Sequence, residues 1–264
     1  MIQSATIPFV EAHGAGNDFL LTWEDRAPQH NHPEIARAIC HRHLGIGADG
    51  WILVRPDAIQ LFNSDGSAAE LSGNGTRCAA AMLVDAGLAQ DEVTLTTGAG
   101  VRHLRLMSRQ NRTFHFEMDM GLPVYRADQI RHPLLLTGGV REVTILNVGN
   151  PQCAVFVDQM PTHWATLGAE IEAHPYFPRR SNVSFVQVID PHTIDVRFFE
   201  RGAGATLSSG TGSTGAGAAA ILRGLVQSPV KIQTQAGDLQ LRWEHSVYLT
   251  GPAEITAAGE FYLS

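Results

Sequence analysis

The sequence predicts an α+β fold that is rich in strands, has few helices and is built from two similar lobes. Its 264 residues are long for one compact domain and comfortable for two domains of about 130 residues each. Short alternations of apolar and polar residues recur along most of the chain, whereas helical spacing appears in four places only. An internal repeat relates the two halves of the chain to each other.

Alternating segments typical of strands run through both halves of the chain. In the first half they are Ile7–Ala12, Gly50–Arg55, Ile59–Asn63, Val93–Thr97, Val101–Leu106 and Thr113–Met118. In the second half they are Glu142–Asn147, Cys153–Val157, Val183–Ile189, Thr193–Phe199, Val230–Thr234, Leu239–Trp243, Ser246–Thr250 and Ala253–Ala257. Helices are expected at Pro33–Leu44, Asn74–Ala86, Trp164–Glu172 and Gly212–Leu222. A proline in the first turn and a glycine just past the end support the first two of these helices.

The segment from Phe62 to Leu88 recurs without a gap 137 positions later (209 minus 72), from Phe199 to Leu225. Each copy contains a strand, a polar loop, a serine, a Gly-x-Gly turn and a helix of small residues. Chance similarity between two segments rich in glycine and alanine is the alternative, but order and spacing favour duplicated lobes. The coincident pairs are Phe62/Phe199, Ser72/Ser209, Gly73/Gly210, Gly75/Gly212, Ala79/Ala216, Ala81/Ala218, Gly87/Gly224 and Leu88/Leu225.

A glycine and a proline at Gly121-Leu122-Pro123 mark the expected boundary between the lobes. We therefore expect an N-terminal lobe of residues 1–120, which also takes a C-terminal strand at about 255–264, and a C-terminal lobe of residues 121–254.

Composition argues against several classes of partner. A net charge of -7 repels phosphate backbones and anionic lipid surfaces, so we expect neither a nucleic acid nor a membrane as partner. No apolar stretch approaches the roughly 18 residues that span a bilayer, and the segment 1–14 lacks the pattern of a signal peptide. Three cysteines provide no disulfide framework, which favours reduced thiols and a cytoplasmic location.

The repeated turn places a serine and two glycines at each expected helix start, in Ser72–Gly75 and in Ser209–Gly212. A helix N-terminus offers free N–H groups and partial positive charge, and glycines let a ligand approach the backbone closely. Two such ends that face each other would hold one anion, for which a carboxylate is the natural candidate. Taken singly, each serine is more simply explained as a helix N-cap.

Other motifs give weaker signals. Residues 210–215 match the dinucleotide pattern G-x-G-x-x-G, but no acidic residue follows about 20 positions later and no βαβ unit surrounds them. The chain has no phosphate-binding P-loop and no G-x-S-x-G elbow of a hydrolase. Histidine pairs at His30/His32 and His41/His43 lack the further ligands that a metal needs, so we expect no metal site.

With these residues in hand, the chain resembles the diaminopimelate epimerase family almost from end to end. The order and spacing of the matching motifs make this resemblance specific for the fold. In the first half the motifs are His13–Phe19, Gly45–Asp49, Phe62–Ser67 and Ser72–Cys78. In the second half they are Gly149–Pro151, Ser181–Val183, Glu200–Gly204 and Ser209–Gly212.

The resemblance implies two lobes, each a strand-rich sheet wrapped around a central helix, with the active site between them. It implies an isomerase that interconverts LL- and meso-diaminopimelate in lysine biosynthesis without a cofactor. In the family, one cysteine thiolate removes the α-proton and a second cysteine on the opposite face returns a proton. The implied partner is therefore a small α-amino acid. The resemblance leaves open whether the protein also forms a homodimer.

By resemblance, the chain keeps the residues that hold the substrate and changes those that carry the chemistry. The substrate-binding positions are Asn17, Asn63, Asn150, Asn182, Glu200 and Arg201, with the helix-end positions Gly73, Asn74, Gly210 and Thr211. Ser72 and Ser209 occupy the two catalytic positions, where the family has cysteines. Other departures are Gln152 in place of a histidine, Gly50 in place of a glutamine and Ala205 in place of a glutamate.

A serine hydroxyl is a far weaker acid than a thiol, so the thiolate mechanism does not transfer directly to a serine pair. Cys78 and Cys153 are expected to lie in the core and not to take over the role. An engineered change is one explanation of the serines, although Gln152 and Ala205 favour a natural departure. The remaining hypotheses are an epimerase with another base, an amino-acid-binding protein without turnover, and an enzyme of dehydration or double-bond isomerisation.

Overall fold

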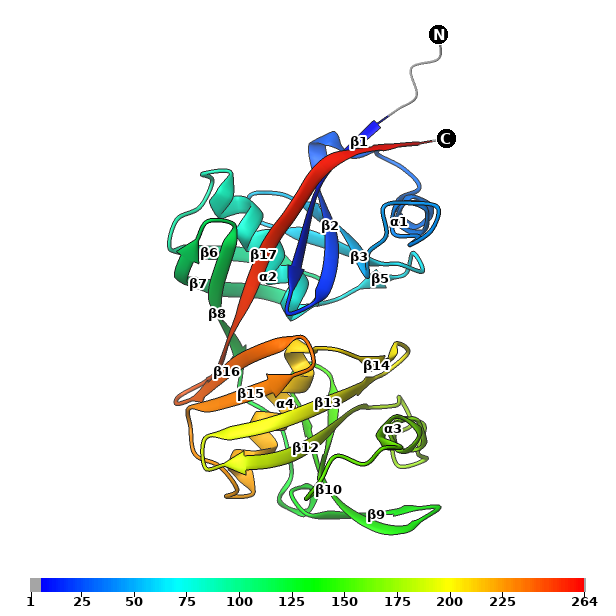
Figure 1. The fold of residues 1–264 in the computed structure, drawn as a ribbon, viewed down its shortest axis with the longest axis vertical. Helices are drawn as coiled ribbons and strands as arrows, with labels where there is room; N and C mark the ends of the chain where they lie inside the picture. Colours follow the sequence, from blue (N-terminus) through cyan, green and yellow to red (C-terminus); the bar gives the residue numbers. More distant parts are fainter. Residues whose placement is uncertain (1–5, 264) are drawn as a thin grey trace. The chain divides into compact units, whose positions relative to one another are not determined.

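The computed structural model describes residues 6–263 (Figure 1); the first five residues of the segment 1–14 lie outside this range. The described chain separates into two compact units. The first unit contains the residues up to Met118 and those from Gly251 onward, and the second unit is Asp119–Thr250. No helix within residues 6–263 is long and apolar enough to cross a bilayer.

The first unit is a sheet of mostly antiparallel strands that surrounds helix α2, Gly73–Asp85 (Figure 1). Its strands are β1 (Thr6–Gly14), β2 (Asn17–Trp23), β3 (Gly50–Val54), β4 (Ile59–Asn63), β5 (Ala68–Ala69), β6 (Glu92–Thr97), β7 (Gly100–Gln110), β8 (Thr113–Gly121) and the later part of β17 (Val247–Tyr262). β2 and β3 pair in parallel, and β1 pairs antiparallel with both β2 and β17. A short helix, α1 (His32–Ile39), follows the 3-10 turn Glu24–Arg26.

The second unit repeats this plan around helix α4, Gly210–Leu222. Its elements are a 3-10 turn at Ala127–Gln129, β9 (His132–Leu136), β10 (Gly139–Asn147), β11 (Pro151–Phe156), α3 (Trp164–Glu172), β12 (Asn182–Asp190), β13 (Thr193–Glu200), β14 (Gly204–Thr206), β15 (Val230–Thr234) and β16 (Gly237–Trp243). β11 and β12 pair in parallel, as β2 and β3 do in the first unit. The predicted α+β fold of two similar, strand-rich units is confirmed.

The two central helices match residue for residue at the predicted shift of 137 positions (210 minus 73, and 222 minus 85). Both end in a glycine of positive φ, Gly87 at 72° and Gly224 at 69°, a conformation that glycine adopts without steric cost. The N–H of the following leucine then reaches back to a helix carbonyl in each case, 3.0 Å from N to O. The repeat therefore extends from the sequence into the local geometry of both helix ends.

Small side chains let the strands close tightly around each helix. A Cβ on Gly217 of α4 would lie 2.8 Å from Cδ1 of Leu241, and one on Gly75 of α2 would lie 3.0 Å from Cδ1 of Ile52. α2 is buried from Gly73 to Val84, and α4 from Gly210 to Ala220. Helices with no exposed face lack the amphipathic stripe of a surface helix, and most residues of both helices are accordingly small.

Some boundaries differ from those predicted. The helix expected at Pro33–Leu44 ends at Ile39, because the backbone turns back and the N–H groups of Ile46 and Gly47 both donate to the Ile39 carbonyl. The two strands expected at Ser246–Thr250 and Ala253–Ala257 are one strand, β17, since Gly251 and Pro252 stay extended. β2, β5, β9 and β14 were not predicted. β2 is buried on both faces from Phe19 to Thr22, so it shows no alternation.

Candidate active site

Ser72 caps the N-terminus of α2. Its backbone is extended (φ −128°, ψ 120°), and its Oγ accepts a hydrogen bond from the N–H of Gly75 at 3.1 Å. The expected N-cap role is thus confirmed for this serine. The first N–H groups of a helix have no partner within the helix, so Gly73 and Asn74 present theirs at this end.

Side-chain amides connect the α2 end to the turn between β1 and β2. The Asn74 Nδ2 donates to Asn17 Oδ1 at 3.2 Å, and the Asn17 Nδ2 donates to Asp49 Oδ2 at 2.6 Å. Gly14 makes this approach possible, because a Cβ there would lie 3.0 Å from the Cβ of Asn74. The structure therefore brings Asn17, Gly73 and Asn74 together beside Ser72, as the resemblance implies.

Asp49 belongs to a group of charged side chains that sequence reasoning missed. Arg42 forms two hydrogen bonds to Asp18 and one, at 2.8 Å, to Asp49. Burial raises the pKa of Asp18, but the hydrogen bonds and charge of Arg42 outweigh burial and leave this pKa below its usual value. Burial and the nearby Asp18 carboxylate raise the pKa of Asp49 despite its bonds to Asn17 and Arg42. The group holds the Asn17 amide in one orientation.

Ser209 caps α4 in the same way, with φ −145°, ψ 123° and a 3.1 Å hydrogen bond from the N–H of Gly212 to its Oγ. It differs from Ser72 in one respect. The Ser209 hydroxyl also donates to Glu200 Oε2 at 2.8 Å, while Thr206 donates to Glu200 Oε1 at 2.7 Å. A carboxylate thus lies directly beside the serine of the second unit. The residue equivalent to Glu200 in the first unit is Asn63 (200 minus 137), a neutral amide.

A second chain of amides links the α4 end to the turn between β10 and β11. The Gln152 Nε2 donates to Asn150 Oδ1 at 2.6 Å, and the Asn150 Nδ2 donates to Thr211 Oγ1 at 3.2 Å. Gln152 is buried against α4, where a Cβ on Gly215 would lie 2.9 Å from its Cγ. Within residues 6–263 its Oε1 has no hydrogen-bond partner. The residue that replaces the family histidine therefore supports Asn150 and not Ser209.

The remaining predicted residues form hydrogen bonds with other partners. Asn182 Oδ1 accepts the backbone N–H of Arg201 at 2.9 Å, and the Asn182 Nδ2 donates to the Pro151 carbonyl at 3.2 Å. The exposed Arg201 guanidinium donates to the carbonyl of Arg179 at 3.3 Å. Asn63 is exposed, and its amide donates to Ser67 Oγ at 2.9 Å.

The three cysteines are free and buried. Burial raises the pKa of Cys78 to about 12, and burial also raises the pKa of Cys153 above its ordinary value. A thiol with a raised pKa is a poor base and nucleophile at neutral pH. The prediction that Cys78 and Cys153 are core residues is confirmed.

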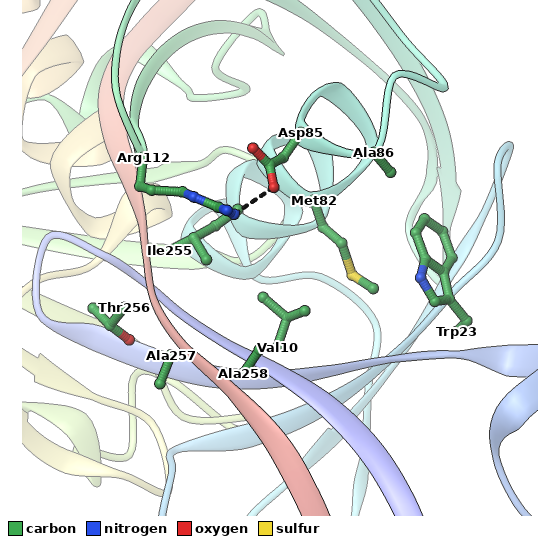
Figure 2. A pocket seen from close by; sticks show the side chains of 10 residues that line it. All are labelled: Val10, Trp23, Met82, Asp85, Ala86, Arg112, Ile255, Thr256, Ala257 and Ala258. Atoms are coloured by element: carbon green, nitrogen blue, oxygen red, sulfur yellow. Dashed lines mark hydrogen bonds and ion pairs between the residues drawn. The ribbon is translucent and has the colours of Figure 1, made fainter.

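A pocket of about 370 Å³ in the first unit lies at the other end of α2 (Figure 2). It is lined by Met82, Asp85 and Ala86 from the last turns of that helix, together with strand residues such as Val10 and Ile255. Arg112 and Asp85 form an ion pair at its edge (Figure 2). Ser72 caps the opposite end of this 13-residue helix, roughly 18 Å away at 1.5 Å per residue. The pocket is therefore separate from the candidate active site.

Comparison with known proteins adds what geometry alone does not give. The family model described as diaminopimelate epimerase matches residues 9–125 and 144–256. The chain belongs to the diaminopimelate epimerase family. A diaminopimelate epimerase of Pelotomaculum thermopropionicum is 38% identical over 274 residues, which cover 96% of this chain and 98% of the relative. One of Moorella thermoacetica is 39% identical over 277 residues, with coverage of 97% and 99%.

The fold has relatives beyond the sequence family. A solved structure of a hydroxyproline epimerase from Agrobacterium vitis superposes with a TM-score of 0.76 at 16% identity, over all of this chain and 94% of that one. At this level of identity the likeness concerns the fold alone. Membership in the diaminopimelate epimerase family places the chain among isomerases, and by resemblance its unusual features are the serines at positions 72 and 209.

Arg77 is a further residue of the site that sequence reasoning missed. It lies on α2 one turn after Asn74, and its Nη2 donates to Asn74 Oδ1. A signal was present in the sequence, since an arginine in a helix of alanine and glycine that is expected to be central must be buried. The contact between Asn17, Asn74 and Asp49 had no such signal, because it depends on how the β1–β2 turn packs on α2.

Proposed function

We propose that the protein is a cofactor-independent isomerase of an α-amino acid, with diaminopimelate or a close relative as substrate. In this proposal Ser72 and Ser209 occupy the two proton-transfer positions. The observation that carries the proposal is the same helix end built twice, with a capping serine and an amide from the neighbouring turn in each unit. The relatives named diaminopimelate epimerase support the choice of substrate.

The reaction moves one proton without any net change in composition. A base takes the α-proton on one face, the electron pair stays on the α-carbon beside the carboxylate, and a proton returns on the other face. N–H groups at the helix ends stabilise the charge that develops on the carboxylate. Glu200 is the carboxylate placed to hold the ligand ammonium or to accept a proton through Ser209, because it already accepts the Ser209 hydroxyl at 2.8 Å.

A second candidate function is binding of an α-amino acid without epimerisation. The serines favour it, since a serine hydroxyl is a far weaker acid than a thiol. In addition, the neutral Asn63 stands at the position of the first unit that corresponds to Glu200. Dehydration or double-bond isomerisation is the third candidate, in which a serine would position a leaving hydroxyl group.

Incubation with L,L- and meso-diaminopimelate in deuterium oxide separates these candidates. We expect the parent protein to incorporate deuterium at the α-carbon, slowly compared with a cysteine-containing member of the family. Calorimetric titration in parallel reports binding. Binding without deuterium incorporation would contradict isomerase activity and support the binding protein, and absence of both would contradict diaminopimelate as ligand.

Replacing Arg201 by alanine is expected to weaken diaminopimelate binding by more than the roughly 1 kcal/mol typical of an exposed ion pair. The reason is that a guanidinium forms charge-assisted hydrogen bonds to a carboxylate, which are roughly twice as strong as hydrogen bonds between neutral groups. Titration calorimetry of Arg201→Ala measures the effect. Arg197→Ala is the matched control, because Arg197 lies on β13, the strand that ends just before Arg201, and pairs with Asp195. Equal affinities for the parent and Arg201→Ala would remove Arg201 from the site.

We also propose that the protein works in the cytoplasm. Three free cysteines, all buried, support a reducing compartment, where thiols persist without forming disulfides.

A further inference from the structure

Arg77 is a charged side chain in the interior of the first unit. Its exposed fraction is 0%, and it is among the largest fully buried side chains of the chain. Its Nε donates to the Pro252 carbonyl at 3.1 Å, and its Nη2 donates to Asn74 Oδ1. Its Nη1 is buried without a hydrogen-bond partner among residues 6–263. Both partners are neutral oxygens, so no described carboxylate balances the charge.

An unbalanced buried cation is costly to keep. Burial lowers the pKa of Arg77 to about 10, which reflects the loss of solvation. Buried charges are ordinarily paired, and replacing even a buried ion pair by well-packed apolar side chains of similar volume is often neutral or stabilising. The tie to Pro252 does not need a charge, because any N–H donor satisfies a carbonyl. Fold stability therefore does not account for the arginine.

The equivalent position of the second unit shows that the helix itself does not require this residue. It is Thr214 (77 plus 137), whose hydroxyl donates to the Gly210 carbonyl at 2.8 Å within α4. The two helices are otherwise alike in length, cap and burial. The extra charge is thus specific to the α2 end, where Ser72 has no counterpart of the Glu200 carboxylate.

We propose that Arg77 is a positioning residue whose buried charge prepares the α2 end for the carboxylate of the ligand. The inference rests on the proposed function, since it concerns the same site. Arg77 holds the Oδ1 of Asn74, which directs the Asn74 Nδ2 to Asn17 and the Asn17 Nδ2 to Asp49. These hydrogen bonds fix the orientation of the side-chain amides of Asn74 and Asn17. The guanidinium adds a full positive charge one turn behind the first N–H groups of α2, which together carry only about half a charge. A bound carboxylate supplies the counterion that Arg77 lacks.

A pair of variants of similar side-chain length tests the charge itself. Arg77→Met removes the charge and keeps most of the volume, whereas Arg77→Lys keeps a charge. We expect Arg77→Met to bind meso-diaminopimelate at least about tenfold more weakly than the parent, as for loss of a charge-assisted interaction, and Arg77→Lys to fall between them. A packing role would not rank the variants by charge.

The melting temperature without ligand is the second measurement. We expect Arg77→Met to melt at or above the temperature of the parent. Thr22→Val is the control for lost buried hydrogen bonds in the same unit, because Thr22 donates to Pro8 and accepts from Trp51. This control should melt lower and bind as the parent does.

Two results would overturn the inference: unchanged affinity in Arg77→Met, or a melting temperature lowered as much as in Thr22→Val, which would make Arg77 a structural residue. If the parent itself does not bind diaminopimelate, the proposed function fails, and the comparison of melting temperatures alone decides whether Arg77 is an uncompensated charge.

Discussion

Replacing Ser72 and Ser209 together by cysteine is expected to raise α-proton exchange of diaminopimelate by orders of magnitude. A thiol has a pKa of about 8.5 and an alcohol one near that of water, about 15.7. The gap of roughly 7 units corresponds to about 10 kcal/mol against forming the base. Helix dipoles contribute only about 0.3–2 kcal/mol, so they lower a thiol pKa usefully but cannot make a serine alkoxide available.

Deuterium incorporation by the parent and by the double cysteine variant at equal concentration measures this effect. Exchange by the variant should increase as the pH rises through the thiol pKa, because the deprotonated thiol is the base. Adding Gln152→His should increase the rate further, since Gln152 has no basic nitrogen. Ser213→Cys is the matched control, because Ser213 is a buried serine of α4 that does not cap the helix. If the parent exchanges as fast as the double variant, serine is no handicap and the base lies elsewhere.

Replacing Glu200 by glutamine is expected to weaken amino-acid binding by about 1.5–3 kcal/mol, the range for hydrogen bonds to charged groups. The change keeps the shape of the side chain and one of the two oxygens that accept the Ser209 and Thr206 hydroxyls, but removes the negative charge that would face the ligand ammonium. Titration calorimetry with meso-diaminopimelate measures the affinity.

Glu170→Gln serves as the control for Glu200→Gln. Glu170 belongs to the same unit but lies on helix α3, not on the helix that Ser209 caps. Its carboxylate accepts the backbone N–H of Thr137 at 2.6 Å. Its charge should not affect binding. Equal affinity for the parent and Glu200→Gln would show that Glu200 does not face the ligand charge.

The sequence predicted those parts of the fold that repeat or alternate. α2 and α4 were found because Ser72 and Ser209 share matching flanks, and β6 and β15 because apolar and polar residues alternate regularly along them. The end of α1 was missed, because the Ile39 carbonyl takes its donors from Ile46 and Gly47, a turn with no local sequence signal. β2 was missed because it is buried on both faces.

The residues of the candidate site also fall into those that the sequence predicts and those that it does not. The capping serines and Glu200 are recognisable from the motifs, and the structure adds that Glu200 accepts the Ser209 hydroxyl. The contacts of Asn17 with Asp49 and of Asn150 with Thr211 join segments that are far apart in the chain. No spacing rule indicates such contacts, since they arise only when the turns before β2 and β11 pack against the helices.

The first and last strands of the chain are neighbours, with consequences for synthesis on the ribosome. Ile7 of β1 pairs with Phe261 of β17, 254 positions later (261 minus 7), whereas the second unit is one uninterrupted stretch from Asp119 to Thr250. During translation the second unit can complete its sheet, except for pairing with the last strand, while β1 still has one unpaired edge. An unpaired edge strand is a template for wrong pairing with another chain. The nascent first unit thus depends on the final residues to close its sheet, and premature termination would leave that edge exposed.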